Sequence, residues 1–319
     1  MNRVLLTGVA GFIGSNIADR LVKDGNKVVG IDNLLTGKLK NIKQLELEDN
    51  FTFVKNDLCD YNTCLRVTEN IDVVCHQAAL PSVPRSIDDP ITSNMHNVTA
   101  TVNLLRACVK NGVKRVVYAS SSSVYGDSPT LPKIEDMRPM PKSPYAVSKL
   151  AGEYYMGAFN KSYDIDTASL RYFNVFGARQ NPKSQYAAVI PKFMIAALGG
   201  EDMVMYGDGL QSRDFTYIDN VVNANVLALN SKTKLNGEFM NIACGERHTL
   251  VNLCEAISDI TDSSSKIVRS EERRGDVKHS LADITKAKRL IGYKPEVGFI
   301  DGLKKTFEFY KRWSDGEGT

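Results

Sequence analysis

The sequence predicts an α/β fold, in which a parallel sheet is covered by helices on both faces. Three observations predict it. Short apolar runs alternate with amphipathic helical patterns over residues 1–173. A glycine-rich turn, Thr7-Gly8-Val9-Ala10-Gly11-Phe12-Ile13-Gly14, separates the first apolar run from the first helical pattern. The second apolar run ends in an acid, Asp32. Together they indicate a Rossmann-type, doubly wound sheet.

Length and composition set the outer limits. A chain of 319 residues can form one large domain or two small ones. Its net charge of +3 is too small to indicate a nucleic-acid or membrane partner. No apolar run reaches membrane-spanning length, and the N-terminus passes directly into a strand, so we expect a cytoplasmic protein. The six cysteines and four histidines lack metal-ligand spacing, so we expect reduced thiols and no metal.

The first strand–helix–strand unit carries the strongest local signal. We expect a strand at 4–6, a helix to about Lys23 and a second strand at 27–31. The glycines let the backbone approach a pyrophosphate, whose charge lies at the helix N-terminus. Asp32 can accept hydrogen bonds from the adenosine ribose hydroxyls and would repel a 2′-phosphate. The unit therefore predicts NAD rather than NADP.

The next strands end in small or polar residues. A strand at 51–55 precedes Asp57, which either accepts from the adenine amino group or serves a turn or helix cap. A strand at 71–75 leads into His76-Gln77-Ala78-Ala79, where small residues admit a flat ring; we expect His76 to be structural. A long helix at 89–111 and a strand at 115–119 follow. Four serines, 120–123, then stand at the carboxyl end of that strand, the usual place for ligands.

A second helix carries the predicted chemistry. Ser143 is a good N-cap and Pro144 fits the first helical position. Tyr145 and Lys149 are four residues apart and share one helix face. A free phenol has a pKa of about 10, and a nearby ammonium lowers it. A shift of roughly three units would need about 4 kcal/mol. The pair therefore predicts a tyrosine base; the alternative is two surface residues on an amphipathic helix.

The strand–helix alternation stops after a sixth strand at 167–171. We expect residues 1–173 to form the NAD-binding domain and residues 174–319 to form mainly a smaller α/β substrate domain, with 213–240 returning to the first domain. Helical patterns cover 188–199, 219–230, 250–262, 283–291 and 302–313, with an extended patch at 203–206. The aromatic residues of the last helix are expected to be core.

These pieces together resemble the extended short-chain dehydrogenase/reductase family over nearly the whole chain. The resemblance is greatest to nucleotide-sugar 4-epimerases that act on UDP-N-acetylhexosamines and their uronic acids. The motifs that carry it are Thr7-Gly-x-x-Gly-x-x-Gly14, Asp32-Asn33-Leu34, Asp57-Leu58, Ser120–Gly126, Tyr145-x-x-x-Lys149, Arg171–Gly177, Arg213-Asp214 and Arg273-x-Gly-Asp276.

The resemblance implies a reaction. Tyr145 as phenolate takes the proton from the sugar O4, Ser121 relays it, and Lys149 holds the nicotinamide ribose and lowers the Tyr145 pKa. Hydride passes from C4 to NAD and returns to the opposite face of the 4-keto sugar. Related dehydratases and decarboxylases are similar to this chain but carry acidic residues at the positions of Ser122 and Ser123. A serine cannot take over the general-acid role of those residues, so simple epimerisation is favoured. The implied cofactor contacts are Gly8, Gly11, Phe12, Ile13, Gly14, Asp32, Asn33, Asp57, Leu58, Gln77, Ala78, Ala79, Tyr145, Lys149 and Tyr172.

The resemblance also implies a substrate pocket. Arg213 and Arg273 are cations for the substrate diphosphate. Ser280 stands where a bulky Tyr in some epimerases excludes an acetamido group, whereas Pro81 departs from the Gly of N-acetyl-accepting relatives. The implied pocket residues are Pro81, Ser122, Ser123, Asn174, Gln180, Ala188, Val189, Tyr206, Arg213, Arg273, Asp276 and Ser280.

We therefore expect C4 epimerisation of UDP-GlcNAc/UDP-GalNAc, with UDP-Glc/UDP-Gal as further substrates. The alternatives are a UDP-N-acetylhexosaminuronate 4-epimerase, for which Lys183 or Lys192 could meet the carboxylate, or another NAD-dependent nucleotide-sugar oxidoreductase. A non-enzymatic NAD-sensing scaffold is disfavoured because Tyr145 and Lys149 are both present. Relatives pair two helices into a four-helix bundle, which here predicts a homodimer formed by 89–111 and 145–162.

Overall fold

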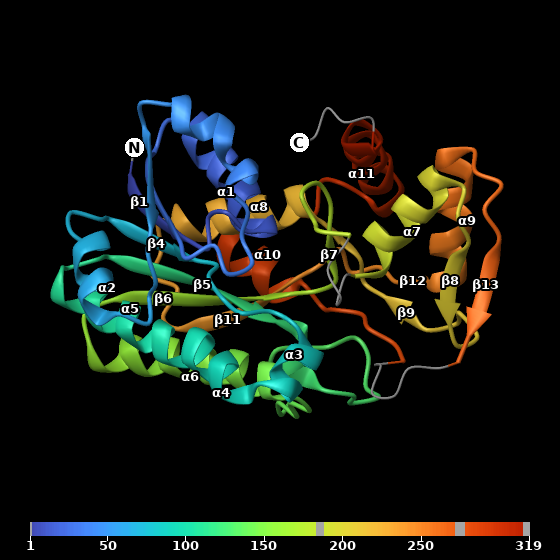
Figure 1. Ribbon diagram of the computed structural model, residues 1–319. Helices are drawn as coiled ribbons and strands as arrows, with labels where there is room; N and C mark the ends of the chain where they lie inside the picture. The colour runs from blue at the N-terminus through green and yellow to red at the C-terminus, as the bar shows by residue number, and fades with distance from the viewer. Residues whose placement is uncertain (1, 183–187, 272–277, 315–319) are drawn as a thin grey trace.

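The computed structural model describes residues 2–182, 188–271 and 278–314 (Figure 1). Its centre is a parallel sheet with the strand order β11-β6-β5-β4-β1-β2-β3. The strands are β1 (Arg3–Thr7), β2 (Lys27–Asp32), β3 (Phe51–Lys55), β4 (Val73–His76), β5 (Arg115–Ser121), β6 (Asp166–Tyr172) and β11 (Glu238–Ile242). Chain order reverses between β1 and β4, which is where a doubly wound sheet opens a crevice. The predicted fold class is confirmed.

Helices cover both faces of this sheet because its buried strands are apolar on both sides. In Figure 1, α1 (Phe12–Lys23) and α8 (Ile218–Leu229) lie on one face, and α2 (Tyr61–Val67), α5 (Ala100–Lys110) and α6 (Pro144–Ser162) lie on the other. Alternation along β1 serves both layers, since Val4 and Leu6 belong to one apolar core and Leu5 to the other.

The predicted helix over 89–111 consists of several pieces. It begins with α4 (Pro90–Asn94), continues as the π-helical turn η3 (Met95–Thr99) and ends as α5, after a further helix, α3 (Val83–Asp88). Asn97 occupies the π turn; it is buried, accepts from Leu80 N at 2.6 Å and donates to Ser148 Oγ at 2.9 Å. These tertiary bonds fix a turn that helical periodicity alone does not reveal.

The chain beyond β6 builds a second layer of small elements. They are β7 (Val175–Phe176), α7 (Val189–Gly199), β8 (Met203–Tyr206), β9 (Ser212–Arg213), β10 (Thr216–Tyr217), β12 (His248–Thr249), α9 (Leu250–Thr261), β13 (Ile267–Ser270) and α11 (Phe299–Ser314). The helix α10 (Thr285–Ile291) instead packs against β11 and α8 of the central sheet. The 3₁₀ turns are η1 (Leu39–Asn41), η2 (Lys43–Leu47) and η4 (Ser122–Tyr125). Phe176, Phe215 and Phe299 pack their rings together at its centre.

Residues 213–240 were expected to return to the first domain, which stays a prediction. Arg213 pairs with His248 in a separate two-stranded sheet, and β11 continues to Ile242 beside β6. Other elements differ at their ends: β4 begins at Val73, β5 runs through Ser121, and α11 begins at Phe299. Two of the four serines therefore lie in the strand. Among the described residues, the structure contains no helix with the length and apolarity needed to cross a bilayer.

Candidate active site

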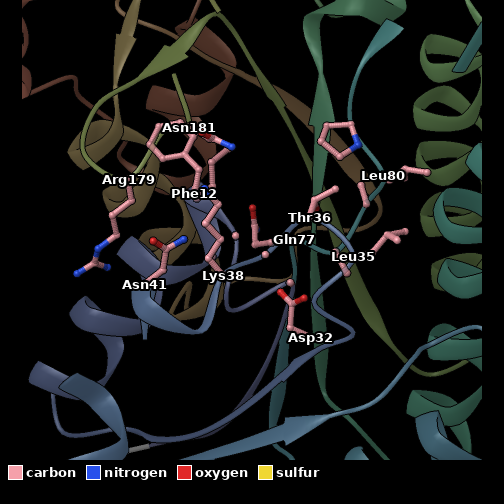
Figure 2. A pocket seen from close by; sticks show the side chains of 18 of the residues that line it. Phe12, Asp32, Leu35, Thr36, Lys38, Asn41, Gln77, Leu80, Arg179 and Asn181 are labelled. Atoms are coloured by element: carbon pink, nitrogen blue, oxygen red, sulfur yellow. The ribbon is translucent and has the colours of Figure 1, made fainter. Parts of the chain in front are cut away.

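A cavity of about 1090 Å³ opens at the carboxyl ends of the central strands. It is lined by the glycine turn after β1, the end of β2 with the following loop, and the segments after β3 and β4. Figure 2 shows Phe12, Asp32, Gln77, Leu80 and Arg179 around it. Sequence motifs far apart in the chain thus meet in one cavity at the switch point of the sheet.

The glycine turn makes close contacts that a side chain would prevent. Gly8 has φ +68°, and a Cβ there would lie 2.8 Å from Ala78 Cα. A Cβ on Gly14 would lie 2.1 Å from Gly8 O, so α1 can only begin in this position with glycine. The N-cap of α1, Gly11, provides no side-chain hydrogen bond. The first N–H groups of α1, at Phe12 and Ile13, therefore border the cavity without a side-chain cap, as a pyrophosphate site requires.

Asp32 is held in place by backbone donors. It accepts from Ala10 N at 3.0 Å and from Leu34 N at 2.8 Å. Burial raises its pKa, and these two N–H groups lower it in part. A Cβ on Gly37 would lie 2.8 Å from Asp32 Oδ2, so the loop can pass the carboxylate only with glycine there. The acid is thus oriented before any ligand arrives.

Asp57 serves the turn that was one of its two expected roles. It accepts from Cys59 N at 2.8 Å and from the amide of Asn33 at 2.8 Å. Burial would raise the Asp57 pKa, but these hydrogen bonds outweigh it and lower the pKa overall. Asp57, Asn33 and Leu58 also line the cavity, so the predicted adenine contact stays compatible with the structure.

His76 belongs to a buried hydrogen-bond chain, as expected for a structural residue. The Thr101 hydroxyl donates to Asn97 O at 2.7 Å, so it accepts from His76 Nε2 at 2.9 Å. His76 Nδ1 then accepts from the Thr7 hydroxyl at 2.8 Å, and Thr7 Oγ1 accepts from Ala78 N at 3.0 Å. Burial and the charge of Lys149 lower the His76 pKa to about 3, so the ring stays neutral. The chain fixes the Ala78 peptide against Gly8.

Asn225 is a site-supporting residue that sequence reasoning missed. It is fully buried on α8 and donates to Tyr172 Oη at 2.8 Å. Its Oδ1 accepts from the Gln77 amide at 3.0 Å. Gln77 and Tyr172 both line the cavity, so a helix more than 50 residues downstream positions two predicted cofactor contacts. The available signal was a pair of amides, Asn223 and Asn225, inside the otherwise apolar stretch 221–229.

Tyr145, Ser121 and Lys149 meet at the end of β5. Ser121 hydrogen-bonds the Tyr145 phenol. Lys149 Nζ donates to Ala119 O at 2.7 Å and lies 6.0 Å from the Tyr145 ring centroid. Burial raises the pKa of Tyr145 to about 12, which the Ser121 bond only partly offsets. Burial also lowers the pKa of Lys149 to about 7.

In the protein by itself, burial outweighs any lowering of the Tyr145 pKa by Lys149, so the proposed effect of the lysine stays a prediction. Near neutral pH the lysine carries only part of its charge, and its ammonium faces a carbonyl oxygen. Desolvation of the phenolate exceeds this attraction.

A buried carboxylate lies one turn further along the same helix. Glu153 is 2% exposed and accepts from Arg171 at 2.8 and 2.7 Å, and from the Ser120 hydroxyl at 2.5 Å. Its charge raises the Lys149 pKa against the effect of burial. Tyr145, Lys149 and Glu153 thus lie on one face of α6, and Glu153, held by Arg171, lies one turn beyond Lys149.

The predicted substrate residues fall into three groups. Pro81, Gln180 and Ala188 line the same cavity, and Val189 begins α7, whose N-cap Ala188 gives no side-chain bond. Asn174 and Ser280 meet through a 3.4 Å hydrogen bond. Several other predicted residues are described but do not line this cavity: Ser121, Ser122, Ser123, Val189, Tyr206 and Arg213. Three more, Arg273, Asp276 and Lys183, lie outside the described residues.

Two parts of the cavity wall were not predicted. Lys38, Lys40 and Asn41 come from the loop after β2. The glycine and lysine that follow Asp32 by five and six residues were the available signal. Next to this loop, where Lys40 Nζ lies 6.0 Å from the Trp313 ring centroid, Phe309, Tyr310 and Trp313 of α11 also border the cavity. Tyr310 is also a core residue, as expected, and its hydroxyl donates to Gln180 O.

The parallel sheet, the glycine cradle, the uncapped helix end and the oriented acid define a dinucleotide-dependent enzyme of the Rossmann type. Residues 4–243 match the family model of the NAD dependent epimerase/dehydratase family. The chain belongs to this family.

Relatives and solved structures agree with that assignment. A UDP-glucose 4-epimerase from Mycolicibacterium smegmatis is 39% identical over 98% of this chain and 99% of its own. The structure of a UDP-N-acetylglucosamine 4-epimerase from Methanobrevibacter ruminantium in complex with UDP-N-acetylmuramic acid is 43% identical, with a TM-score of 0.93 over 98% of this chain and 99% of that one. A UDP-glucuronic acid 4-epimerase from Bacillus cereus, in complex with UDP-glucuronic acid and NAD, is 35% identical, with a TM-score of 0.90 over 98% and 99%.

These enzymes are isomerases. The predicted family, the NAD cofactor and the 4-epimerase class are confirmed. The residues of the cavity fit NAD, because a Cβ on Gly8 or Gly14 would fill the space beside the helix end, and within the described part of the chain Asp32 accepts only from backbone N–H groups.

Proposed function

We propose that this protein interconverts the C4 epimers of UDP-GlcNAc and UDP-GalNAc, and accepts UDP-Glc and UDP-Gal as further substrates. The observation that carries the proposal is the meeting of Tyr145, Ser121 and Lys149 at the end of β5, beside the cavity that fits NAD. Bound NAD would accept a hydride from the sugar and return it. The glycine turn and Asp32 would hold its pyrophosphate and adenosine ribose.

The side chains of this protein would handle the proton. Tyr145 removes it from the sugar O4, and Ser121, hydrogen-bonded to the phenol, passes it between the two oxygens. Burial raises the Tyr145 pKa to about 12, so positive charge near the phenol would favour its role as a base.

The absence of acids next to the base limits the reaction to epimerisation. Ser122 and Ser123 occupy η4, directly after β5. Neither hydroxyl can act as the general acid needed to expel the 6-hydroxyl of the sugar. Ser123 Oγ is buried and has no hydrogen-bond partner among the described residues, as expected of a group that a substrate satisfies.

Small side chains favour an acetylated sugar. Ser280 Oγ accepts from Asn174 Nδ2 at 3.4 Å, a long bond that a ligand can replace. Both residues are half-buried. A serine there leaves the volume that an acetamido group needs.

A uronic acid is the second candidate substrate. Arg85 and Arg179 line the cavity. Arg179 pairs with Asp19 at 2.7 Å, while its Nη1 is buried without a partner in the described part of the chain. A substrate carboxylate would suit that donor.

Incubation of the purified protein with UDP-GlcNAc, UDP-Glc and UDP-GlcA, without added NAD, tests the proposal. We expect each productive substrate to reach an equilibrium of C4 epimers, followed by ¹H NMR, with no net change in NADH absorbance. Ser280→Tyr should abolish the acetylated reaction selectively, whereas Ser280→Ala should keep both. Net cofactor reduction, or equal loss on both substrates in Ser280→Tyr, would contradict the proposal.

We further propose that two copies pair through the helices expected to form the dimer. Ile87, Ile91, Met95, Val147 and Tyr154 of α3, α4, η3 and α6 are all more than 45% exposed. Static light scattering at micromolar concentration should give twice the mass of one chain, and Ile91→Glu should reduce it to one.

A further inference from the structure

Three side chains of the metal-ligating types converge at the edge of the cavity beyond β3. Asp57 and Cys59 come from the loop that follows β3, and His96 comes from the π-helical turn η3. Cys59 Sγ lies 3.5 Å from His96 Nδ1, and His96 Nδ1 lies 3.9 Å from Asp57 Oδ2. All three ligand atoms lie within 4.8 Å of one another. We call this group the Asp57–Cys59–His96 cluster.

The distances are close to those of a tetrahedral zinc site. Zinc binds sulfur at about 2.3 Å and nitrogen or oxygen at about 2.0–2.2 Å, which places S and N roughly 3.6 Å apart and N and O roughly 3.4 Å apart. The S···N separation of 3.5 Å already fits. The N···O separation of 3.9 Å needs a closure of about half an ångström, within the range of side-chain rotation.

The chain holds the three residues in this arrangement by separate means. Single π-helical turns occur often at functional sites, and here the turn is anchored by the buried Asn97 next to His96. Asp57 is fixed through its other oxygen by Cys59 N. The side chain of His96 is 18% exposed and that of Asp57 is 38% exposed, so an ion can enter from solvent.

We propose that the Asp57–Cys59–His96 cluster binds a thiophilic divalent cation of the Zn²⁺ class, with water as the fourth ligand. Thiolate and imidazole select such ions over Mg²⁺ and Ca²⁺. The S–H bond of Cys59 breaks, a metal–sulfur bond forms, and the proton goes to solvent.

The cluster shares residues with the cavity wall. Asp57 and His96 both line the cavity, and a bound cation would take Asp57 Oδ2 out of it. The family cofactor is expected to place its adenine against Asp57. Cation and NAD should therefore weaken each other's binding by the same factor.

Titration of the chelator-treated full-length protein with CoCl₂ tests the site, because Co²⁺ occupies zinc sites and absorbs visible light. We expect ligand-field bands and a thiolate-to-cobalt charge-transfer band that saturate at one ion per chain and disappear when ZnCl₂ is added. Cys59→Ser should remove the charge-transfer band. His96→Ala should weaken Co²⁺ binding by more than about 10-fold, the lower end of what even outer contacts contribute.

Cys244→Ser is the matched control, since Cys244 is another half-buried free thiol away from the cluster. It should leave the spectrum unchanged. Circular dichroism verifies that each variant is folded, and the NAD content of each sample is measured beside it. An unchanged charge-transfer band in Cys59→Ser, unchanged affinity in His96→Ala, or no such band in the unmodified protein would overturn the proposal.

Discussion

The two ends of the cavity are built in different ways. At the cofactor end, glycines bring backbone within contact distance and Asp32 is fixed by two backbone N–H groups. On the substrate side, the Oε1 of Gln180, which lines the cavity, has no partner among the described residues, and Asn174 and Ser280, which lie outside the lining, share a long bond. The difference indicates a preorganised site for a cofactor that stays and a site with unsatisfied polar groups for a ligand that changes.

The largest expected effect lies where the two ends meet. Tyr145→Phe removes the proposed base but keeps the ring, so kcat should fall by about 10²- to 10⁴-fold, or about 3–5 kcal/mol. Bound NAD should be retained, as measured by chromatography of the denatured protein. Tyr163→Phe, on an exposed tyrosine at the end of α6, should have no effect. An undiminished rate in Tyr145→Phe would refute the proposed role of the phenol.

The close packing at the cofactor end can be tested by adding one methyl group at Gly8. Gly8→Ala places a Cβ 2.8 Å from Ala78 Cα, so bound NAD per chain should fall at least about 10-fold, which corresponds to about 1.4 kcal/mol. Gly112→Ala is the control, because Gly112 has nearly the same φ of +69° but nothing within 4 Å of its Cβ. It should cost only about 1 kcal/mol of backbone strain and keep its NAD. Equal NAD loss in both variants would show that strain, not close approach, is the cause.

Glu153, the buried acid on the same face of α6 as Tyr145, should control the pH profile of kcat/KM. Glu153→Gln removes the charge that raises the Lys149 pKa, so that pKa falls below about 7 and the alkaline limb of kcat/KM moves to lower pH. Arg171 loses its partner, which costs about 3–5 kcal/mol of stability. Arg115→Gln, which breaks the Arg115–Asp166 pair at the other end of β5, should lose stability without moving the limb. If the alkaline limb of the kcat/KM profile stays in place in Glu153→Gln, Glu153 has only a structural role.

A last prediction concerns stability against pH. Lys149 has a pKa of about 7 in the folded protein and 10.5 when unfolded, so between these values the unfolded chain binds more protons. Stability should therefore rise with pH from about 7 to 10, by at most about 1.4 kcal/mol per unit. Urea unfolding at pH 7 and 9 measures this contribution, and Lys149→Met should lack it. A slope that is the same in both proteins would contradict the low pKa.

Features that depend on residues close together in the chain could be predicted from the sequence. The glycine turn, Asp32 and the Tyr145–Lys149 spacing are local patterns, and each lies in the cavity where the motif placed it. Asn225 and the π-helical turn depend on tertiary bonds to Tyr172 and Leu80, which no spacing reveals. The Tyr145 pKa depends on desolvation, a property of the packed fold, and the sequence indicated only the neighbouring charge. Likewise, Asn174 and Ser280 are 106 residues apart, so their contact follows from the fold alone.

The position of β11 has a consequence during synthesis. β6 stays an open edge until β11, which ends at residue 242 of 319, has left the ribosome. A nascent chain or a fragment that stops after residue 173 would expose the backbone of β6 and lack α8, so it is expected to aggregate or recruit chaperones. The nucleotide-binding sheet therefore closes late, and autonomous expression of the N-terminal half should fail although it contains the glycine turn, Asp32 and the Tyr145–Lys149 pair.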